Sequence, residues 1–256
     1  MKFSIITPTY KRKEKLTRAV ASLIAQTYKD WEMIIINDSP QDTSYTDFAS
    51  SINDARIHYH VNDYNRGKNF SCNFALDKVS ADSQWIIFLD DDDYFAPDTL
   101  AILHNLILLH SEKKWFVTNR ALTNGKPLTQ FPHDEHVYSY AWNYLILRRL
   151  KGDATHCIET KLITHTHSRF SRFVKQGEEW FFFFQIGLYT KMYYIDHNST
   201  ITDGYDMESG LNFRKRSFRD RYEAILKLTY EGIAKKIIRP SFIIYILIRC
   251  IRLVVQ

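Results

Sequence analysis

The chain of 256 residues is long enough for one large domain, or for one domain with an appendage. Its composition, 45% hydrophobic and 25% charged, is ordinary for a soluble globular protein, and no run reaches the roughly 18 to 20 apolar residues that span a bilayer. The net charge of +5 is uneven, because residues 214–256 carry +8 and the remainder −3. Residues 1–213 therefore lack the basic surface expected of a protein that binds nucleic acid.

Strand and helix patterns alternate along the first 115 residues. Short apolar runs, several rich in β-branched residues, predict strands at residues 3–7, 31–36, 57–61 and 85–89. Leu16, Val20, Leu23 and Ile24 recur at the spacing of an amphipathic helix. Further helices are expected at residues 45–52, 69–79 and 97–110.

This alternation predicts a mostly parallel sheet with helices on both faces. In such sheets, ligands bind outside the carboxyl ends of the strands. Three polar clusters fall at predicted strand ends, at residues 7–10, 37–39 and 90–93. We therefore expect a ligand site along that edge of the sheet.

The pattern is less regular after residue 115. A strand is expected at residues 115–122, before an Asn124-Gly125 turn, and another at 192–195. Helices are expected at residues 138–150 and 180–189, and the basic segment from residue 214 onward also has a helical pattern.

The stretch FLDDDDYF places four carboxylates, Asp90 to Asp93, directly after a predicted buried strand. Alternation along an extended chain would put Asp90 and Asp92 on one side. Paired carboxylates suit a hard divalent cation, which could carry a diphosphate and neutralise its charge. The alternative is a solvated acidic loop at the start of the helix near Pro97.

Five segments together resemble family 2 glycosyltransferases, which are inverting, sugar-nucleotide-dependent enzymes with the GT-A fold. In chain order they are SIITPTYKR, WEMIIINDSPQD, Asn65-Arg66-Gly67 followed by Asn73, FLDDDD, and GEEW at residues 177–180. The resemblance implies a GT-A domain over residues 1–212, with a nucleotide-binding half (1–115) and an acceptor-binding half (116–212). Residues 213–256 would form a separate helical, basic tail.

The resemblance also implies the residues that bind the donor and a metal ion. Donor-nucleotide contacts are expected at Pro8, Thr9, Tyr10, Asp38, Asn65, Gly67, Asn73, Asp90 and Asp91. Asp38 would accept a hydrogen bond from the uracil N3–H, which favours a UDP-sugar. Asp92 is expected to be the main ligand of Mn²⁺ or Mg²⁺, with Asp93 close to the metal or the sugar.

The GEEW segment is expected to supply the general base. A carboxylate must take the proton of the acceptor hydroxyl as that hydroxyl attacks the anomeric carbon. The resemblance selects Glu179, although the family commonly has aspartate there, and Glu178 is the rival base. Both glutamates could instead cap the helix that begins at Trp180. His156 and Trp180 are expected on the acceptor side.

Other residues depart from the family pattern or fit it less closely. Cys72 stands where the family usually has an arginine, and Arg66 or Lys68 could supply the missing charge. His165 and His167 would share one face if they lay on a strand, and we expect them at the surface or on the acceptor side. His197 is expected to be an ordinary surface histidine.

The tail after Pro240 has the pattern of an amphipathic helix. Its polar stripe consists of Ser241, Tyr245, Arg249, Arg252 and Gln256. Arginines beside a wide apolar face suit an anionic bilayer surface. The alternatives are packing against the body of the enzyme or against a second subunit in a homo-oligomer.

These features predict transfer of a hexose or N-acetylhexosamine from a UDP-sugar to a hydroxyl of a lipid-linked glycan. The three cysteines lack metal or redox spacing, and KFSIITPTY is too short for a signal peptide, so we expect a cytoplasmic protein on the inner face of the plasma membrane. The alternatives are an inactive sugar-nucleotide-binding or scaffold protein and a nucleotidyltransferase.

Overall fold

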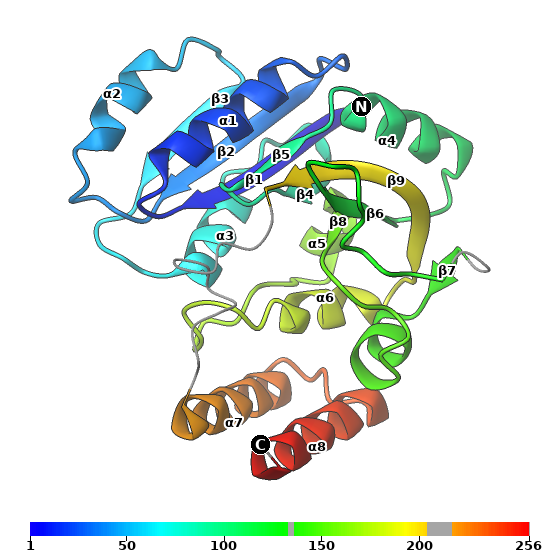
Figure 1. Ribbon diagram of the computed structural model, residues 1–256. Helices are drawn as coiled ribbons and strands as arrows, with labels where there is room; N and C mark the ends of the chain where they lie inside the picture. Colours follow the sequence, from blue (N-terminus) through cyan, green and yellow to red (C-terminus); the bar gives the residue numbers. More distant parts are fainter. Residues whose placement is uncertain (133–135, 204–216, 256) are drawn as a thin grey trace.

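A mixed β-sheet organises the computed structural model, which describes residues 1–132, 136–203 and 217–255 (Figure 1). The strands are β1 (Lys2–Thr9), β2 (Trp31–Asn37), β3 (Ile57–Val61), β4 (Ser83–Phe88), β5 (Asp93–Phe95), β6 (Trp115–Leu122), β7 (Val137–Tyr138), β8 (Ala154–Glu159) and β9 (Met192–Thr202). Their order is β3-β2-β1-β4-β8-β6-β9-β5, with β7 paired to β9. Strands β1 to β4 run parallel, whereas β8 is antiparallel to both β4 and β6.

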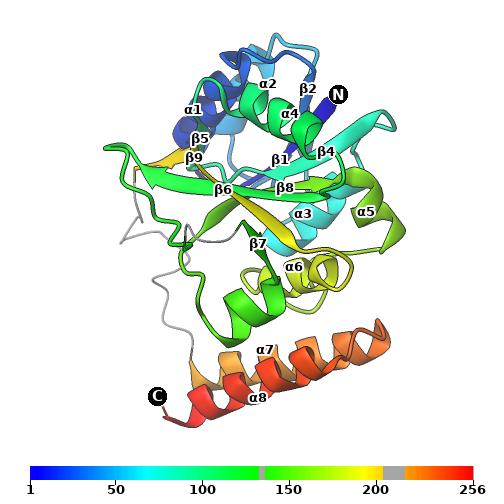
Figure 2. The same cartoon turned by 90° about the vertical axis from the view of Figure 1, so that its right-hand side faces the viewer.

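Helices cover both faces of this sheet, as the alternating pattern predicted. The helices are α1 (Lys13–Ile24), α2 (Ser44–Ser51), α3 (Lys68–Leu76), α4 (Thr99–Leu109), the π-helix η1 (Tyr140–Ile146), α5 (Thr160–His165), α6 (Trp180–Gly187), α7 (Phe218–Ala234) and α8 (Pro240–Val255). Figure 2 shows α7 and α8 as a separate layer beyond α6 and η1.

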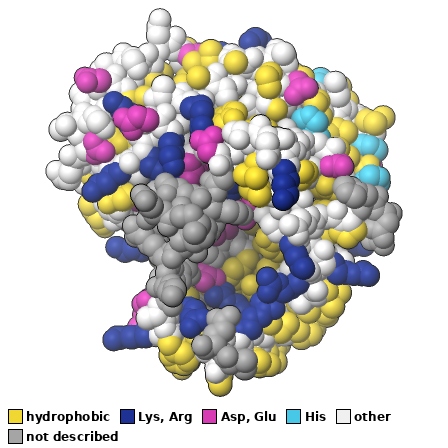
Figure 3. Space-filling model, in the orientation of Figure 1, with side chains coloured by type: hydrophobic (Ala, Val, Ile, Leu, Met, Phe, Trp, Pro, Cys, Tyr) yellow, Lys and Arg dark blue, Asp and Glu magenta, His cyan; other side chains and the backbone are white. Residues whose placement is uncertain are grey.

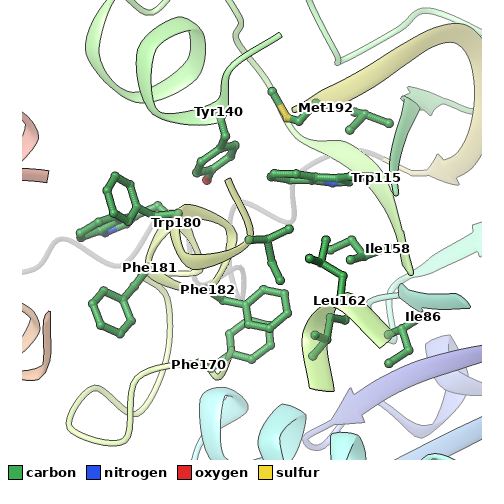
Figure 4. Close-up of a cluster of buried hydrophobic side chains, with 14 of the residues drawn as sticks. Ile86, Trp115, Tyr140, Ile158, Leu162, Phe170, Trp180, Phe181, Phe182 and Met192 are labelled. Carbon is green, nitrogen blue, oxygen red and sulfur yellow. The ribbon is translucent and has the colours of Figure 1, made fainter. Parts of the chain in front are cut away.

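Two hydrophobic cores lie on opposite faces of the sheet because successive strand residues alternate sides. Ile5 and Ile87 belong to the core with α1, α2 and α4, whereas Ile6 and Ile86 belong to the core with α3, α5 and α6. Figure 4 shows the core that contains Ile86, where the Trp115 ring lies beside Tyr140 of η1. Trp115 also stacks on Phe183 of α6. This core joins the sheet to η1, α6 and the two tail helices.

The first four predicted strands and their helices are confirmed, but the later prediction was incomplete. Strands β5, β7 and β8 were not expected, and β9 has 11 residues where residues 192–195 were predicted. The sequence of β8, ATHCIE, mixes polar and apolar residues and so lacks a clear apolar run. His165 ends α5 and His167 follows it, so the two do not lie on a strand.

The tail packs against the body through two helices, and the described residues of its polar stripe are buried or half-buried. Arg249 and Tyr245 lie against the segment around Trp180, whereas Ile243, Leu247 and Ile251 are exposed. Of the arrangements expected for the tail, packing against the body of the enzyme is therefore observed for Arg249 and Tyr245. The predicted boundary near residue 212 lies outside the described residues. No described helix combines the length and hydrophobicity needed to cross a membrane.

Phe242 is the main apolar anchor of α8. Its buried ring packs 5.3 Å from the ring of Phe184 and contacts the backbone of α7 at Gly232. Removing it would leave a cavity between α6, α7 and α8.

We predict that Phe242→Ala lowers the free energy of unfolding by about 3 to 5 kcal/mol, because transfer and cavity costs add. Urea denaturation measures the change. Ile243→Ala, on the same helix but about half exposed, should cost less than about 1 kcal/mol. Equal losses for the two variants would contradict this packing.

Candidate active site

The carboxyl ends of β1, β2 and β4 meet at one edge of the sheet, because these three strands are parallel neighbours. The backbone N–H of Asp38 donates to the carbonyl of Thr9 at 2.9 Å. The N–H of Tyr10 points to the carboxylate of Asp91 at 3.4 Å. The three predicted polar clusters therefore share one edge, as expected.

The four aspartates separate into two kinds at this edge. Asp91 and Asp93 are buried, whereas Asp90 and Asp92 are partly exposed. Carboxylate oxygens of Asp90, Asp92 and Asp93 lie within 4.8 Å of one another. Asp91 instead turns toward Tyr10 and Arg12. Asp90 therefore joins the two predicted metal ligands.

Three cationic side chains from different elements surround the aspartates. The Arg12 guanidinium lies 2.6 Å from Asp92, the Lys68 ammonium 2.7 Å from Asp90, and Arg120 2.8 Å from Asp93. Burial alone would lower the pKa of Arg120, but Asp93 and its neighbours outweigh burial and raise it. Sequence reasoning gave no role to Arg12, although Arg12 is the last residue of SIITPTYKR. It also missed Arg120, which no motif marks.

The acidic cluster suits a hard divalent cation. Burial raises the pKa of Asp93 to about 7; Arg120 opposes this shift, and Asp90 and Asp92 add to it. Ionising all these carboxylates together is therefore unfavourable without further positive charge. Three converging carboxylate oxygens are ligands that Mg²⁺ and Mn²⁺ accept. The donor set fits either ion.

Lys68 places a positive charge close to Cys72, the position where the family usually has an arginine. It lies one turn before Cys72 on α3, and its ammonium reaches Asp90 at 2.7 Å and Glu179 at 3.6 Å. Burial raises the pKa of the Cys72 thiol to about 12, so that group stays neutral. Arg66 instead stacks on the Phe70 ring, 3.5 Å from its centroid.

The two adjacent glutamates point in opposite directions. Gly177 and Glu178 both adopt the left-handed backbone region, with φ of 70° and 64°. The Glu178 carboxylate pairs with the Arg249 guanidinium of α8 and accepts from the Trp180 indole N–H, and only 8% of its side chain is exposed. Glu179 is 38% exposed and faces Lys68. Of the two, Glu179 is the residue at the site.

The loop that carries these glutamates is bound on one side to α3. The Asn69 amide donates to the carbonyls of Val174 and Gly177 at 2.8 and 3.1 Å. The Asn73 side chain exchanges two hydrogen bonds with the backbone of Phe170. Asn73, expected as a donor contact, therefore positions this loop.

The other side of the same loop is bound to the tail. The buried carboxylate of Glu231, on α7, accepts from the Ser171 hydroxyl at 2.6 Å. Arg249, on α8, holds Glu178 as described. Residues 170–179 thus lie between α3 and the tail.

The loop before α3 is organised by Asp38. The two oxygens of this buried carboxylate accept from the backbone N–H groups of Arg66 and Gly67 at 2.8 and 2.7 Å. Gly67 has a φ of 91°, and a Cβ there would lie 2.4 Å from the Lys175 carbonyl oxygen. Only glycine fits that contact.

The remaining predicted donor residues frame the same edge. The Thr9 hydroxyl is hydrogen-bonded to Tyr45 at 2.7 Å. Pro8 is half-buried, and Tyr10 and Asn65 are exposed. Tyr10 and Asn65 are therefore accessible to a ligand without rearrangement.

The predicted acceptor-side residues lie in aromatic clusters. The Trp115 indole N–H donates to His156 Nδ1 at 3.1 Å, and burial lowers the pKa of His156 to about 3. His156 is therefore a neutral ring, packed 4.2 Å from Phe183. Trp180 is buried against Tyr245 of α8. His197 bonds Ser199 on β9 and does not join the acidic cluster.

Comparisons with known proteins agree with this geometry. Residues 4–168, more than half of the chain, match the family model described as "Glycosyl transferase family 2". The match ends before Glu178 and Glu179, so their assignment depends on the structure. Among curated relatives, the putative colanic acid biosynthesis glycosyl transferase WcaA of Escherichia coli K12 is 25% identical, over 88% of this chain and 84% of its own.

A second relative is similar over a shorter region. The Escherichia coli protein named UDP-Glc:alpha-D-GlcNAc-diphosphoundecaprenol beta-1,3-glucosyltransferase WfaP is 37% identical over 44% of this chain and 43% of its own. The chain thus spans less than half of WfaP.

Solved structures share the fold at low sequence identity. S. aureus TarS 1-349 in complex with UDP-GlcNAc has a TM-score of 0.75 at 20% identity, covering 90% of this chain and 66% of TarS 1-349. The mannosyltransferase PcManGT of Pyrobaculum calidifontis, solved with GDP-Man and Mn²⁺, has a TM-score of 0.64 at 16% identity, covering 95% and 68%. The GT-A fold expected from the sequence is confirmed.

We predict that Arg249→Met lowers the free energy of unfolding by about 3 kcal/mol, because it leaves the Glu178 carboxylate buried without its cation. The double variant Glu178→Gln/Arg249→Met should recover part of that loss. Urea denaturation measures both changes.

The matched control is Arg219→Met, which removes an exposed arginine paired with Glu223 on α7. Its cost should stay below about 1 kcal/mol. If Arg249→Met lowered the free energy of unfolding no more than this control, the Glu178–Arg249 pair would not stabilise the contact between the loop and α8.

Proposed function

Because the chain belongs to glycosyl transferase family 2, we propose that it transfers a hexose or an N-acetylhexosamine from a UDP-sugar to a hydroxyl of a lipid-linked glycan, with inversion. The observation that carries the proposal is the position of Glu179. Its carboxylate lies across Lys68 from Asp90, so a base and an acidic metal-binding cluster face the same space. Transfer to an acceptor hydroxyl needs both.

The donor site would lie along the edge formed by β1, β2 and β4. Asp38 Oδ2 accepts one hydrogen bond, from Gly67, and retains a lone pair for the uracil N3–H. Tyr10 offers an exposed ring to the base. The UDP-GlcNAc complex of TarS and the name of WfaP support a UDP-sugar.

Asp90, Asp92 and Asp93 would hold the divalent cation. When bound, Mg²⁺ or Mn²⁺ would supply positive charge to the diphosphate of the donor and to the departing UDP. Arg12 lies against Asp91 and Asp92 and adds a fixed positive group at the same edge. Lys68 adds another and keeps the Asp90 side of the cluster ordered.

Glu179 would act as the general base in a single displacement. Its carboxylate accepts the proton of the acceptor hydroxyl while the oxygen of that hydroxyl bonds to the anomeric carbon. The bond to UDP breaks on the opposite face, which inverts the configuration. The exposed fraction of Glu179 supports access for an acceptor, and Lys68 at 3.6 Å restrains its carboxylate.

The structure offers less support for an inactive binding protein. That alternative relied on the absence of an arginine at Cys72, and Lys68 places a cation beside this position. Nucleotidyl transfer would leave Glu179 without a role. A lipid-linked acceptor is supported by the name of WfaP, which includes a diphosphoundecaprenol-linked sugar. Such an acceptor is consistent with a protein at the inner face of the plasma membrane.

We predict that Glu179→Gln slows sugar transfer by about 10²-fold or more, because the amide cannot take the proton. UDP release from UDP-glucose or UDP-GlcNAc, with an undecaprenyl-diphosphate-linked sugar as acceptor, measures the rate. UDP affinity should change by less than about twofold, since the nucleotide contacts lie elsewhere.

Glu159→Gln is the matched control. Glu159 is paired with Lys114 and lies beside Trp85 near the start of β4, at the opposite edge of the sheet. This variant should keep its transfer rate. Unchanged transfer by Glu179→Gln would assign the base to another residue.

A further inference from the structure

A cavity of about 230 Å³ lies where α7 and α8 meet the base-carrying loop. Its polar lining consists of Glu178, Arg221, Tyr245, Arg249 and Arg252, and Ile225 and Leu253 contribute apolar walls. Glu178 forms one wall, whereas its neighbour Glu179 faces Lys68 and does not line the cavity. The cavity lies on the opposite side of the loop from the acidic cluster.

The cavity carries an excess of positive charge. Glu178 neutralises one arginine, Arg249, through two hydrogen bonds. Arg221 and Arg252 add two further guanidinium groups to the lining. Arg252 is half-buried and forms no ion pair with any residue in the described part of the chain. Planar guanidinium groups bind phosphate oxygens in pairs, so the cavity suits a phosphorylated ligand.

Both helices that form the cavity expose apolar side chains on their outer sides. These residues recur every three or four positions: Phe218, Tyr222, Leu226, Tyr230 and Ile233 on α7, and Ile243, Leu247, Ile251 and Val254 on α8. In Figure 3 Lys and Arg side chains gather over the lower part of the molecule, above a rim of hydrophobic side chains. Phosphate-binding groups beside an exposed apolar surface match a lipid with an anionic headgroup.

We propose that this cavity binds the phosphate groups of a lipid-linked acceptor, while the exposed apolar stripes of α7 and α8 lie on the bilayer that holds its chain. The proposal depends on the proposed function for the class of acceptor. It assigns Arg252 as the headgroup contact.

The position of the cavity accounts for the arginines on the inner side of α8. If the helix only lay on an anionic membrane, its arginines would flank the outer apolar face. Arg249 and Arg252 instead line the cavity, whereas the outward residues of α8 are apolar. The arrangement separates two tasks: apolar residues contact the bilayer, and arginines face a headgroup.

The test compares binding of the whole protein to two kinds of phosphatidylcholine vesicle by flotation. One kind carries undecaprenyl diphosphate, and the other carries phosphatidylglycerol at the same surface charge. The wild type should bind the diphosphate vesicles more tightly. Arg252→Gln should lose about tenfold of that affinity, in line with a charged hydrogen bond, and Arg252→Lys should lose less because it keeps the charge.

Arg239→Gln is the matched control, because it removes the same charge from an exposed position just before α8. It should lower binding to both kinds of vesicle equally, by less than about threefold. Inorganic pyrophosphate, which has no chain, should compete only weakly.

Three results would overturn the proposal: equal binding of the wild type to both kinds of vesicle, equal losses for Arg239→Gln and Arg252→Gln, or competition by pyrophosphate as strong as by the lipid. UDP binding with Mn²⁺ is measured on the same preparations. UDP binding without lipid selectivity would overturn the headgroup site alone. Selectivity that depends on Arg252, without UDP binding, would overturn the donor function and leave the site.

Discussion

The functional arrangement depends on how residues 170–179 are held between two parts of the molecule. From the sheet side, Asn69 and Asn73 of α3 bind the backbone of this segment. From the tail side, Glu231 binds Ser171, and Arg249 binds Glu178. A loop fixed on both sides can hold the Glu179 carboxylate in one place, which loops alone rarely do.

The turn at Gly177 and Glu178 converts two neighbouring carboxylates into groups with different tasks. A left-handed backbone at a non-glycine residue is unfavourable and needs compensation from its surroundings. The ion pair with Arg249 and the hydrogen bond from Trp180 supply it. Glu178 thereby becomes a buried structural group, and Glu179 is directed to Lys68 and the acids. The tail is thus part of the active-site architecture.

Much of the nucleotide-binding half could be predicted from the sequence because its signals are local. Buried parallel strands are apolar runs, and polar residues directly after them must share an edge. The residues that sequence reasoning missed are those whose roles arise from distant elements. Arg120 reaches Asp93 from β6, and Arg12 reaches Asp92 from the segment between β1 and α1, and no spacing in the chain encodes either contact.

The tail shows a second limit of sequence reasoning. Periodicity reveals a polar stripe on α8 but does not say which way the stripe faces. The buried carboxylate of Glu178 pairs with Arg249 on the inner side, and the apolar residues Ile243, Leu247 and Ile251 are left exposed. The resemblance selects Glu179 over Glu178, but the opposite directions of the two carboxylates depend on the backbone conformation at residue 178, which the sequence does not reveal.

The central claim is that this edge of the sheet binds a uridine nucleotide with a divalent cation. The most direct measurement is a thermal-shift panel of UDP, GDP, CDP and ADP, each with Mn²⁺ and with EDTA. A ligand at a hundred times its dissociation constant stabilises by about 2.7 kcal/mol, which is a shift of several degrees. The account predicts stabilisation by UDP that requires Mn²⁺. No response to any nucleotide, or an equal response to UDP in EDTA, would contradict it.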